Sequence, residues 1–185
     1  MRRISLPNVV FFLLYASGVY GLVLWPPIRT VVTSLIAPID GIDRVPLVIR
    51  CIIAFVVMDA CSYWIHRAAH ASSLLWFFHR VHHTGPSLGP LTTFRFHIVE
   101  IAWRMVTQLV PLYVLSVETA IPPAIFMAFA AFEMVAHSSI DWNFGPVGRV
   151  VVSPAYHAAH HGDGDRTNFG MLLVVWDVLF GTANH

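Results

Sequence analysis

Charged residues are scarce in this sequence. Only 11% of its 185 residues are charged and 57% are hydrophobic, whereas a soluble domain usually carries about 25% charged residues. This deficit indicates a lipid environment. All eleven basic residues are arginine, the formal net charge is +1 and no basic patch occurs, so we expect no nucleic-acid partner.

Several motifs of known chemistry are also absent. There is no HExxH, so a zinc peptidase would lack its general base. No P-loop, GxGxxG or GxSxG occurs, which removes sequence support for nucleotide binding and for serine hydrolysis. The two cysteines, Cys51 and Cys61, share one apolar stretch. They predict small buried side chains rather than a disulfide.

Histidine, by contrast, is abundant, and nine of the eleven histidines are predicted metal ligands. Within HRAAH, HRVHH and HAAHH they stand three or four residues apart, so each cluster can aim its imidazoles from one face of a helix. The nine are His66, His70, His79, His82, His83, His137, His157, His160 and His161. They exceed what one ion can use, whereas two six-coordinate ions would leave a few positions for water or dioxygen.

Four apolar stretches are long enough to enter or cross a bilayer, over about 8–25, 46–65, 98–116 and 119–136. We expect Pro26-Pro27 to end the first, and the segment 26–45 to be a short outer connection. The first stretch lacks an A-x-A-like cleavage site and predicts a retained anchor. The fold class is therefore all-α: a polytopic integral membrane protein of about four transmembrane helices, with residues 1–185 as a single membrane domain.

The arginines predict the orientation of these helices. Arg2 and Arg3 place the N-terminus in the cytoplasm by the positive-inside rule. Four crossings then return the chain to the cytoplasm at residues 66–97 and again after residue 137, so all nine histidines meet on one side. We expect a helical, histidine-rich cap on the cytoplasmic face of the membrane, the inner membrane if the source is bacterial.

A few ionisable residues interrupt the apolar stretches. Asp59 precedes the first clustered histidine by seven residues, about two turns, and shares its helix face. Glu100 and Arg104 are spaced i,i+4, and we favour a mutually satisfied ion pair. Glu133 lies one turn before the lone histidine of the nine, and either orients it or faces other helices.

The ligand chemistry favours iron. Neutral imidazoles argue against magnesium and calcium, and zinc usually takes four ligands. Iron beside lipid-embedded helices suggests dioxygen activation against a lipid C–H bond. The alternative is a non-enzymatic metal-binding membrane protein, such as a zinc carrier or sensor. Transporters place ionisable residues near the bilayer midplane, whereas these histidines lie past the predicted helix ends.

The order of the clusters resembles the fatty acid hydroxylase/sterol desaturase superfamily, whose members carry HxxxH, HxxHH and a second HxxHH. Shorter elements match as well: R-F-H-x-x-E at 95–100, H-S-S at 137–139, S-P at 153–154, N-F-G at 168–170 and W-D-x-L-F-G-T at 176–182. In the first, isoleucine replaces the family's proline, and in the second, serine replaces asparagine. The similarity covers about residues 55–183.

The resemblance implies a membrane-bound, non-haem di-iron oxygenase that hydroxylates or desaturates a lipid. It implies two iron ions per chain, dioxygen as co-substrate, and a fatty acyl, sterol or related substrate. Nothing in the sequence looks like a fused cytochrome or flavin domain. We therefore expect a separate electron donor: a reductase, a ferredoxin or a cytochrome b5-like protein.

Four more residues are candidates for a supporting role or an additional ligand position. His97 begins the third apolar stretch, and Asp141 stands where some family members carry a further histidine. Asn168 belongs to a matched element after the last cluster. Asp177 accepts an N–H from a ligating imidazole, or it is a buried structural carboxylate or a helix N-cap.

Overall fold

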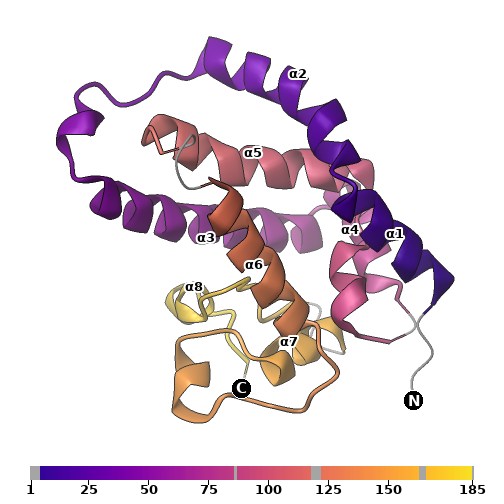
Figure 1. Cartoon of the computed structure of the whole chain (residues 1–185). Helices are drawn as coiled ribbons and strands as arrows, with labels where there is room; N and C mark the ends of the chain where they lie inside the picture. The colour runs from indigo at the N-terminus through magenta and orange to yellow at the C-terminus, as the bar shows by residue number, and fades with distance from the viewer. Residues whose placement is uncertain (1–4, 86, 118–121, 163–165, 185) are drawn as a thin grey trace.

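Helices make up the regular elements of the described chain, apart from one isolated bridge between Val151 and Leu173. The computed structural model describes residues 5–85, 87–117, 122–162 and 166–184. The α-helices are α1 (Leu6–Ala16), α2 (Val19–Leu35), α3 (Leu47–Ala71), α4 (Ser73–His83), α5 (Ile98–Val114), α6 (Pro122–Ala136), α7 (Pro154–His161) and α8 (Val175–Leu179). Three short 3-10 turns join them: η1 (Ile42–Arg44), η2 (Pro90–Phe94) and η3 (Gly145–Arg149). The all-α prediction is confirmed (Figure 1).

Helices α3 and α5 form the centre of the molecule. They lie side by side, with α2 against α5 and α4 against α3 (Figure 1). Buried apolar side chains fill this centre, including Met58 of α3, Leu112 of α5 and Phe129 of α6. Removing such side chains from water stabilises the packing by about 25 cal/mol per Å². The core therefore fixes the two long helices relative to each other, and with them the polar residues near their ends.

One described helix, α3, is long and apolar enough to cross a membrane by itself. Helices α1 and α2 pass the same test as a pair, but they are bent by 53° at the break between them. Helices α5 and α6 have 17 and 15 residues. Of the roughly four predicted spans, length and composition thus support one, or two if the bent pair forms a single span.

The first apolar stretch is divided differently from the prediction. The break lies at Gly18, whose φ of 73° is a conformation that glycine adopts without strain. Pro26 and Pro27 lie inside α2, which continues to Leu35. The prediction that this Pro-Pro pair ends the first helix is therefore wrong. Proline removes a hydrogen bond, but its φ of about −65° is helical, and apolar helices tolerate it where neighbouring groups compensate.

Short caps determine where the histidine-bearing helices begin. Ser72 separates α3 from α4, and its hydroxyl accepts the N–H of Leu75 (3.4 Å). Ser153 caps α7 in the same way by accepting the N–H of Tyr156 (3.2 Å), with Pro154 at the first helical position. HRAAH therefore ends α3, HRVHH ends α4 and HAAHH ends α7.

Candidate metal centre

The structure brings all nine predicted histidines together in two groups. The five-histidine group contains His66, His70, His79, His83 and His160. The four-histidine group contains His82, His137, His157 and His161. Within each group the candidate ligand atoms all lie within 4.8 Å of one another. The groups are neighbours, since the rings of His83 and His161 stack at 4.3 Å between centroids.

Each HxxHH motif is divided between the two groups. In α4, His79 and His83 belong to the five-histidine group, and the histidine between them, His82, belongs to the four-histidine group. In α7 the two outer histidines of the motif belong to the four-histidine group and the inner one, His160, belongs to the five-histidine group. Residues four apart lie one above the other on a helix, whereas the residue three along points to a neighbouring sector. The motif therefore offers an i,i+4 pair to one ion and a single imidazole to a second ion beside it.

The distances between imidazole nitrogens fit metal coordination. His137 Nε2 lies 3.0 Å from Nε2 of both His82 and His157. His79 and His83 bring their Nε2 atoms to 3.2 Å in the other group. Two nitrogens that each bind an ion at about 2.1 Å lie about 3.0 Å apart when they subtend a right angle. The spacing is therefore that of adjacent ligands on one ion.

The outer nitrogens show which ring atoms carry protons. His66 Nδ1 lies 2.9 Å from the Phe169 carbonyl, and His160 Nδ1 lies 2.8 Å from the Thr167 carbonyl. His137 Nδ1 lies 2.7 Å from the Glu133 carbonyl. A carbonyl can only accept, so each Nδ1 donates and each neutral ring has a bare Nε2. These lone pairs face one another, and Nε2 of His66 and of His160 has no protein hydrogen-bond partner in the described chain. A cation between them satisfies this arrangement.

Burial keeps the imidazoles neutral. His160 is fully buried and His137 is 1% exposed. Burial lowers the pKa of each to about 4. Burial, followed by the neighbouring imidazoles, also lowers the pKa of His82, His83 and His161. Metal binding requires the neutral ring, so these side chains are in the binding form at neutral pH.

The carboxylates pair differently from the prediction. Glu100, 1% exposed, accepts the Nδ1–H of His79 at 2.8 Å. Arg104 forms its ion pair with Glu133 instead, and its guanidinium lies 4.5 Å over the Phe96 ring. The predicted Glu100–Arg104 pair is therefore wrong. The i,i+4 spacing was compatible with it, but the packing of α5 against α4 and α6 gives each side chain a partner from another helix.

None of the four additional candidates belongs to the described histidine groups, and two of them, His97 and Asp141, make no hydrogen bond to the described part of the C-terminal segment that supports those groups. His97 is the N-cap of α5, where its Nδ1 accepts the N–H of Val99 (3.2 Å), and its ring lies 4.9 Å from that of Phe78. Asp141 is exposed.

The other two candidates are fully buried and hold the C-terminal segment. Asn168 donates to the carbonyls of Tyr156 (3.3 Å) and Asn184 (2.9 Å). Asp177 accepts the backbone N–H groups of Phe169 and Gly170. Asp177 therefore bonds to no imidazole of the described residues. It bonds to the backbone of Phe169, whose carbonyl accepts the Nδ1–H of His66.

The sequence did not predict the carbonyl groups that accept hydrogen bonds from the histidine Nδ1 atoms, because these carbonyls belong to the backbone. No side-chain pattern marks the carbonyls of Thr167 and Phe169. Asp59 does share a helix face with His66, as predicted, but its carboxylate accepts from the N–H groups of Leu172 (3.1 Å) and Leu173 (3.2 Å), and from Trp176 Nε1 (2.8 Å). The carboxylates Asp59 and Asp177, placed in apolar surroundings, were the sequence features that indicated a backbone segment packed against them near the histidines.

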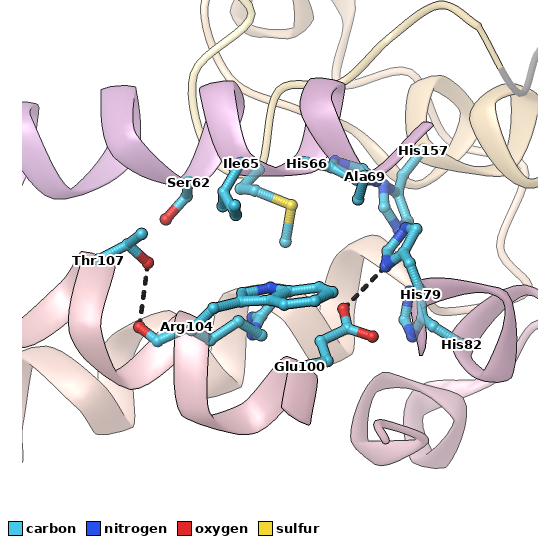
Figure 2. Close-up of a pocket in the computed structure, with 12 residues that line it drawn as sticks. Ser62, Ile65, His66, Ala69, His79, His82, Glu100, Arg104, Thr107 and His157 are labelled. Atoms are coloured by element: carbon cyan, nitrogen blue, oxygen red, sulfur yellow. Dashed lines mark hydrogen bonds and ion pairs between the residues drawn. The ribbon is translucent and has the colours of Figure 1, made fainter. Parts of the chain in front are cut away.

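A cavity between α3 and α5 leads to the histidines. Figure 2 shows Ser62 and Thr107 at one end, and His66, His79 and His157 at the other. Its wall is mixed, and the remaining lining residues are Ile65, Ala69, His82, Glu100, Trp103, Arg104 and Met171. The inner end of the cavity contains histidines of both groups.

The fold and site define an apolar, all-helical protein with a buried pair of histidine-rich candidate metal sites. A family model described as fatty acid hydroxylase matches residues 51–182. The chain therefore belongs to the fatty acid hydroxylase family, as the motif order predicted. No solved structure matches it significantly.

Three relatives show the breadth of the family. Ornithine lipid hydroxylase OlsE of Rhizobium tropici is 31% identical over 147 residues, 77% of this chain and 44% of the relative. Human alkylglycerol monooxygenase is 28% identical over 70% of this chain and 29% of its own length. Methylsterol monooxygenase 1-3 of Arabidopsis thaliana is 26% identical over 95% of this chain and 61% of its own length. The chain thus spans less than two thirds of each of these relatives.

Proposed function

We propose that the protein is a membrane-bound di-iron oxygenase that hydroxylates or desaturates a lipid. The observation that carries this proposal is the convergence of bare, buried Nε2 atoms in two adjacent groups at the end of a cavity between apolar helices. Family membership supports it, because the relatives are named as lipid hydroxylases and monooxygenases.

The nine histidines are the proposed ligands, five for one ion and four for the other. On two six-coordinate ions, nine imidazoles leave three positions for dioxygen and water. Bound iron would supply the redox chemistry that dioxygen reduction requires. Asp141 and His97 are not proposed as ligands.

The protein residues supply orientation and a dry site. Glu100 and the carbonyls of Thr167, Phe169 and Glu133 fix the ring tautomers, so that every oriented Nε2 points inward. An apolar chain would approach the histidines along the cavity between α3 and α5. The cavity has room for about one water molecule, so its lining side chains must move apart to admit a chain. Family relatives act on lipids of different shape, so the class proposed is a membrane lipid with an aliphatic C–H bond.

The overall reaction needs an external reductant. In hydroxylation, one oxygen atom of dioxygen enters the C–H bond and the other leaves as water, with two electrons and two protons supplied from outside. In desaturation two hydrogens leave the lipid, and with two further electrons and two protons from outside both oxygen atoms become water. A separate reductase, ferredoxin or cytochrome b5-like protein is the proposed donor.

The proposed topology places the histidines at the cytoplasmic face, with about four crossings. The support is the arginine distribution, together with the position of the three clusters at helix ends. Accessibility of single cysteine tags near His79 and His157 would test it. Labelling of the two tags from opposite sides of the membrane would contradict the topology.

Incubation with labelled dioxygen tests the reaction. Iron-loaded protein, a lipid extract and a chemical reductant should give labelled, hydroxylated lipid, or a new alkene with labelled water, only when the labelled dioxygen is supplied. A product formed anaerobically would rule out an oxygenase. A wild-type chain that binds zinc alone in iron-replete cells, with no lipid product, would favour the carrier or sensor.

A further inference from the structure

The two histidine groups differ in where their Nδ1 acceptors come from. In the four-histidine group, His137 donates to the carbonyl of Glu133, one turn earlier on its own helix. In the five-histidine group, His66 and His160 donate to carbonyls of residues 167–170, here called the acceptor loop. This loop is separated from His66 by about a hundred residues. The five-histidine group therefore depends on a segment that must be held in place by other contacts.

Asp177 holds the acceptor loop. Its Oδ1 accepts the N–H of Phe169 at 2.8 Å, and its Oδ2 accepts the N–H of Gly170 at 2.7 Å. Thr182 donates its hydroxyl to Oδ1 at 2.7 Å, and its backbone carbonyl accepts the N–H of Asn168 at 2.9 Å. The carboxylate is fully buried, and hydrogen bonds to a charged acceptor are stronger than those between neutral groups.

Gly170 makes the close approach of this carboxylate possible. A Cβ atom at residue 170 would lie 2.8 Å from Asp177 Oδ2 and 2.7 Å from the Leu173 carbonyl. No side chain fits there without moving the loop or the carboxylate. The same loop places the Phe169 ring 5.8 Å from the ring of His66 and 5.7 Å from that of His160. Loop position and histidine orientation are therefore coupled through both the carbonyls and the ring.

We propose that Asp177 is a positioning residue that acts selectively on the five-histidine group by holding the acceptor loop, whose carbonyls orient His66 and His160. The inference rests on the proposed two-ion site, but it does not depend on which lipid reacts. Loss of Asp177 lowers the affinity for the ion of the five-histidine group and leaves the other ion bound. Loss of an outer hydrogen-bond partner typically costs about 10–100-fold in metal affinity, and here two ligands lose their orientation together.

Metal counting on the full chain in detergent tests this without an activity assay. The probe is ferrous iron, added anaerobically and titrated while bound iron per chain is measured. Wild type should bind two ions, and Asp177→Asn should retain one with unchanged affinity while the second weakens by about 100-fold. Adding His137→Ala to Asp177→Asn should abolish the remaining ion, whereas adding His66→Ala should not.

Asp59→Asn is the matched control. Asp59 is equally buried and holds the same C-terminal segment, but at residues 172–176, which carry no imidazole acceptor. It should lower thermal stability and leave the affinity for each ion at its wild-type value. If Asp177→Asn fails to fold, Thr182→Val, which removes one hydrogen bond to Oδ1, should weaken the same ion more mildly.

Three results would overturn the inference: wild-type affinity for both ions in Asp177→Asn or Thr182→Val, equal weakening of the binding of both ions, or a wild type that binds a single ion. Two ions in wild type with selective loss, but no lipid product in the dioxygen assay, would leave the inference standing and contradict the proposed function instead.

Discussion

The two histidine groups use the same helices in different ways. Both draw ligands from α4 and α7, yet the four-histidine group is completed by His137 at the end of α6, whereas the five-histidine group is completed by HRAAH at the end of α3. The acceptor of His137 is local, and those of His66 and His160 come from the C-terminal loop. A local acceptor forms with its helix, but a distant one forms only when the tertiary structure closes. The metal affinities of the two groups should therefore change differently when the same kind of residue is substituted.

The largest effect should come from removing one ligand in each group. His82→Ala acts on the four-histidine group and His160→Ala on the five-histidine group. Each should lower lipid turnover by more than about 100-fold, since loss of even an outer partner can cost that much. The apolar helices supply most of the folding energy, so both variants should remain in the membrane fraction. Wild-type turnover in an iron-loaded variant would remove that residue from the ligand set.

Breaking the ion pair between Arg104 and Glu133 tests whether the backbone carbonyl of residue 133 is enough to orient His137. Arg104→Met leaves the largely buried Glu133 carboxylate unpaired and should destabilise the protein by about 3–5 kcal/mol, measured by denaturant titration. Arg104→Met/Glu133→Leu should recover most of this loss and still bind two ions, because His137 uses the carbonyl of residue 133. Loss of one ion in the double variant would show that the carboxylate matters to the site.

Obstructing the cavity should reduce turnover without disturbing either group. Thr107→Phe places a ring at the end of the cavity away from the histidines, and kcat/KM should fall by about 10–100-fold through misplacement of the lipid. Bound iron should stay at two per chain. Val106→Phe is the control, since Val106 is 37% exposed and does not line the cavity. Equal losses in the two variants would exclude the cavity as the substrate route.

The smallest effect should come from Asp141→Ala. This residue is exposed and belongs to neither group. Stability should change by no more than about 0.5 kcal/mol, and both ions should keep their affinity in the iron titration. Selective weakening of the four-histidine group would restore Asp141 as a ligand candidate.

The sequence predicted the local parts of this molecule and missed the distant ones. The grouping of the nine histidines was predictable, because i,i+3 and i,i+4 spacing determines which side chains share a helix face. The bounds of the apolar helices were less so: the first breaks at Gly18 instead of ending at Pro26-Pro27, and one or two of the four expected spans are long enough to cross a membrane. The division of each HxxHH motif between two groups was not predictable, since it depends on how α4 and α7 pack against α3 and α6. Glu100 was paired wrongly for the same reason: the competing partner, His79, is close only in the tertiary structure. The carbonyls of the acceptor loop carry no side-chain signal at all.

Mössbauer spectroscopy of the wild-type chain, loaded with the Mössbauer-active iron isotope, tests the central claim most directly. Five imidazoles around one ion and four around the other are unlike environments. The account predicts two quadrupole doublets of equal area, accounting for two irons per chain. A single doublet from one iron per chain, or no bound iron at all, would contradict it.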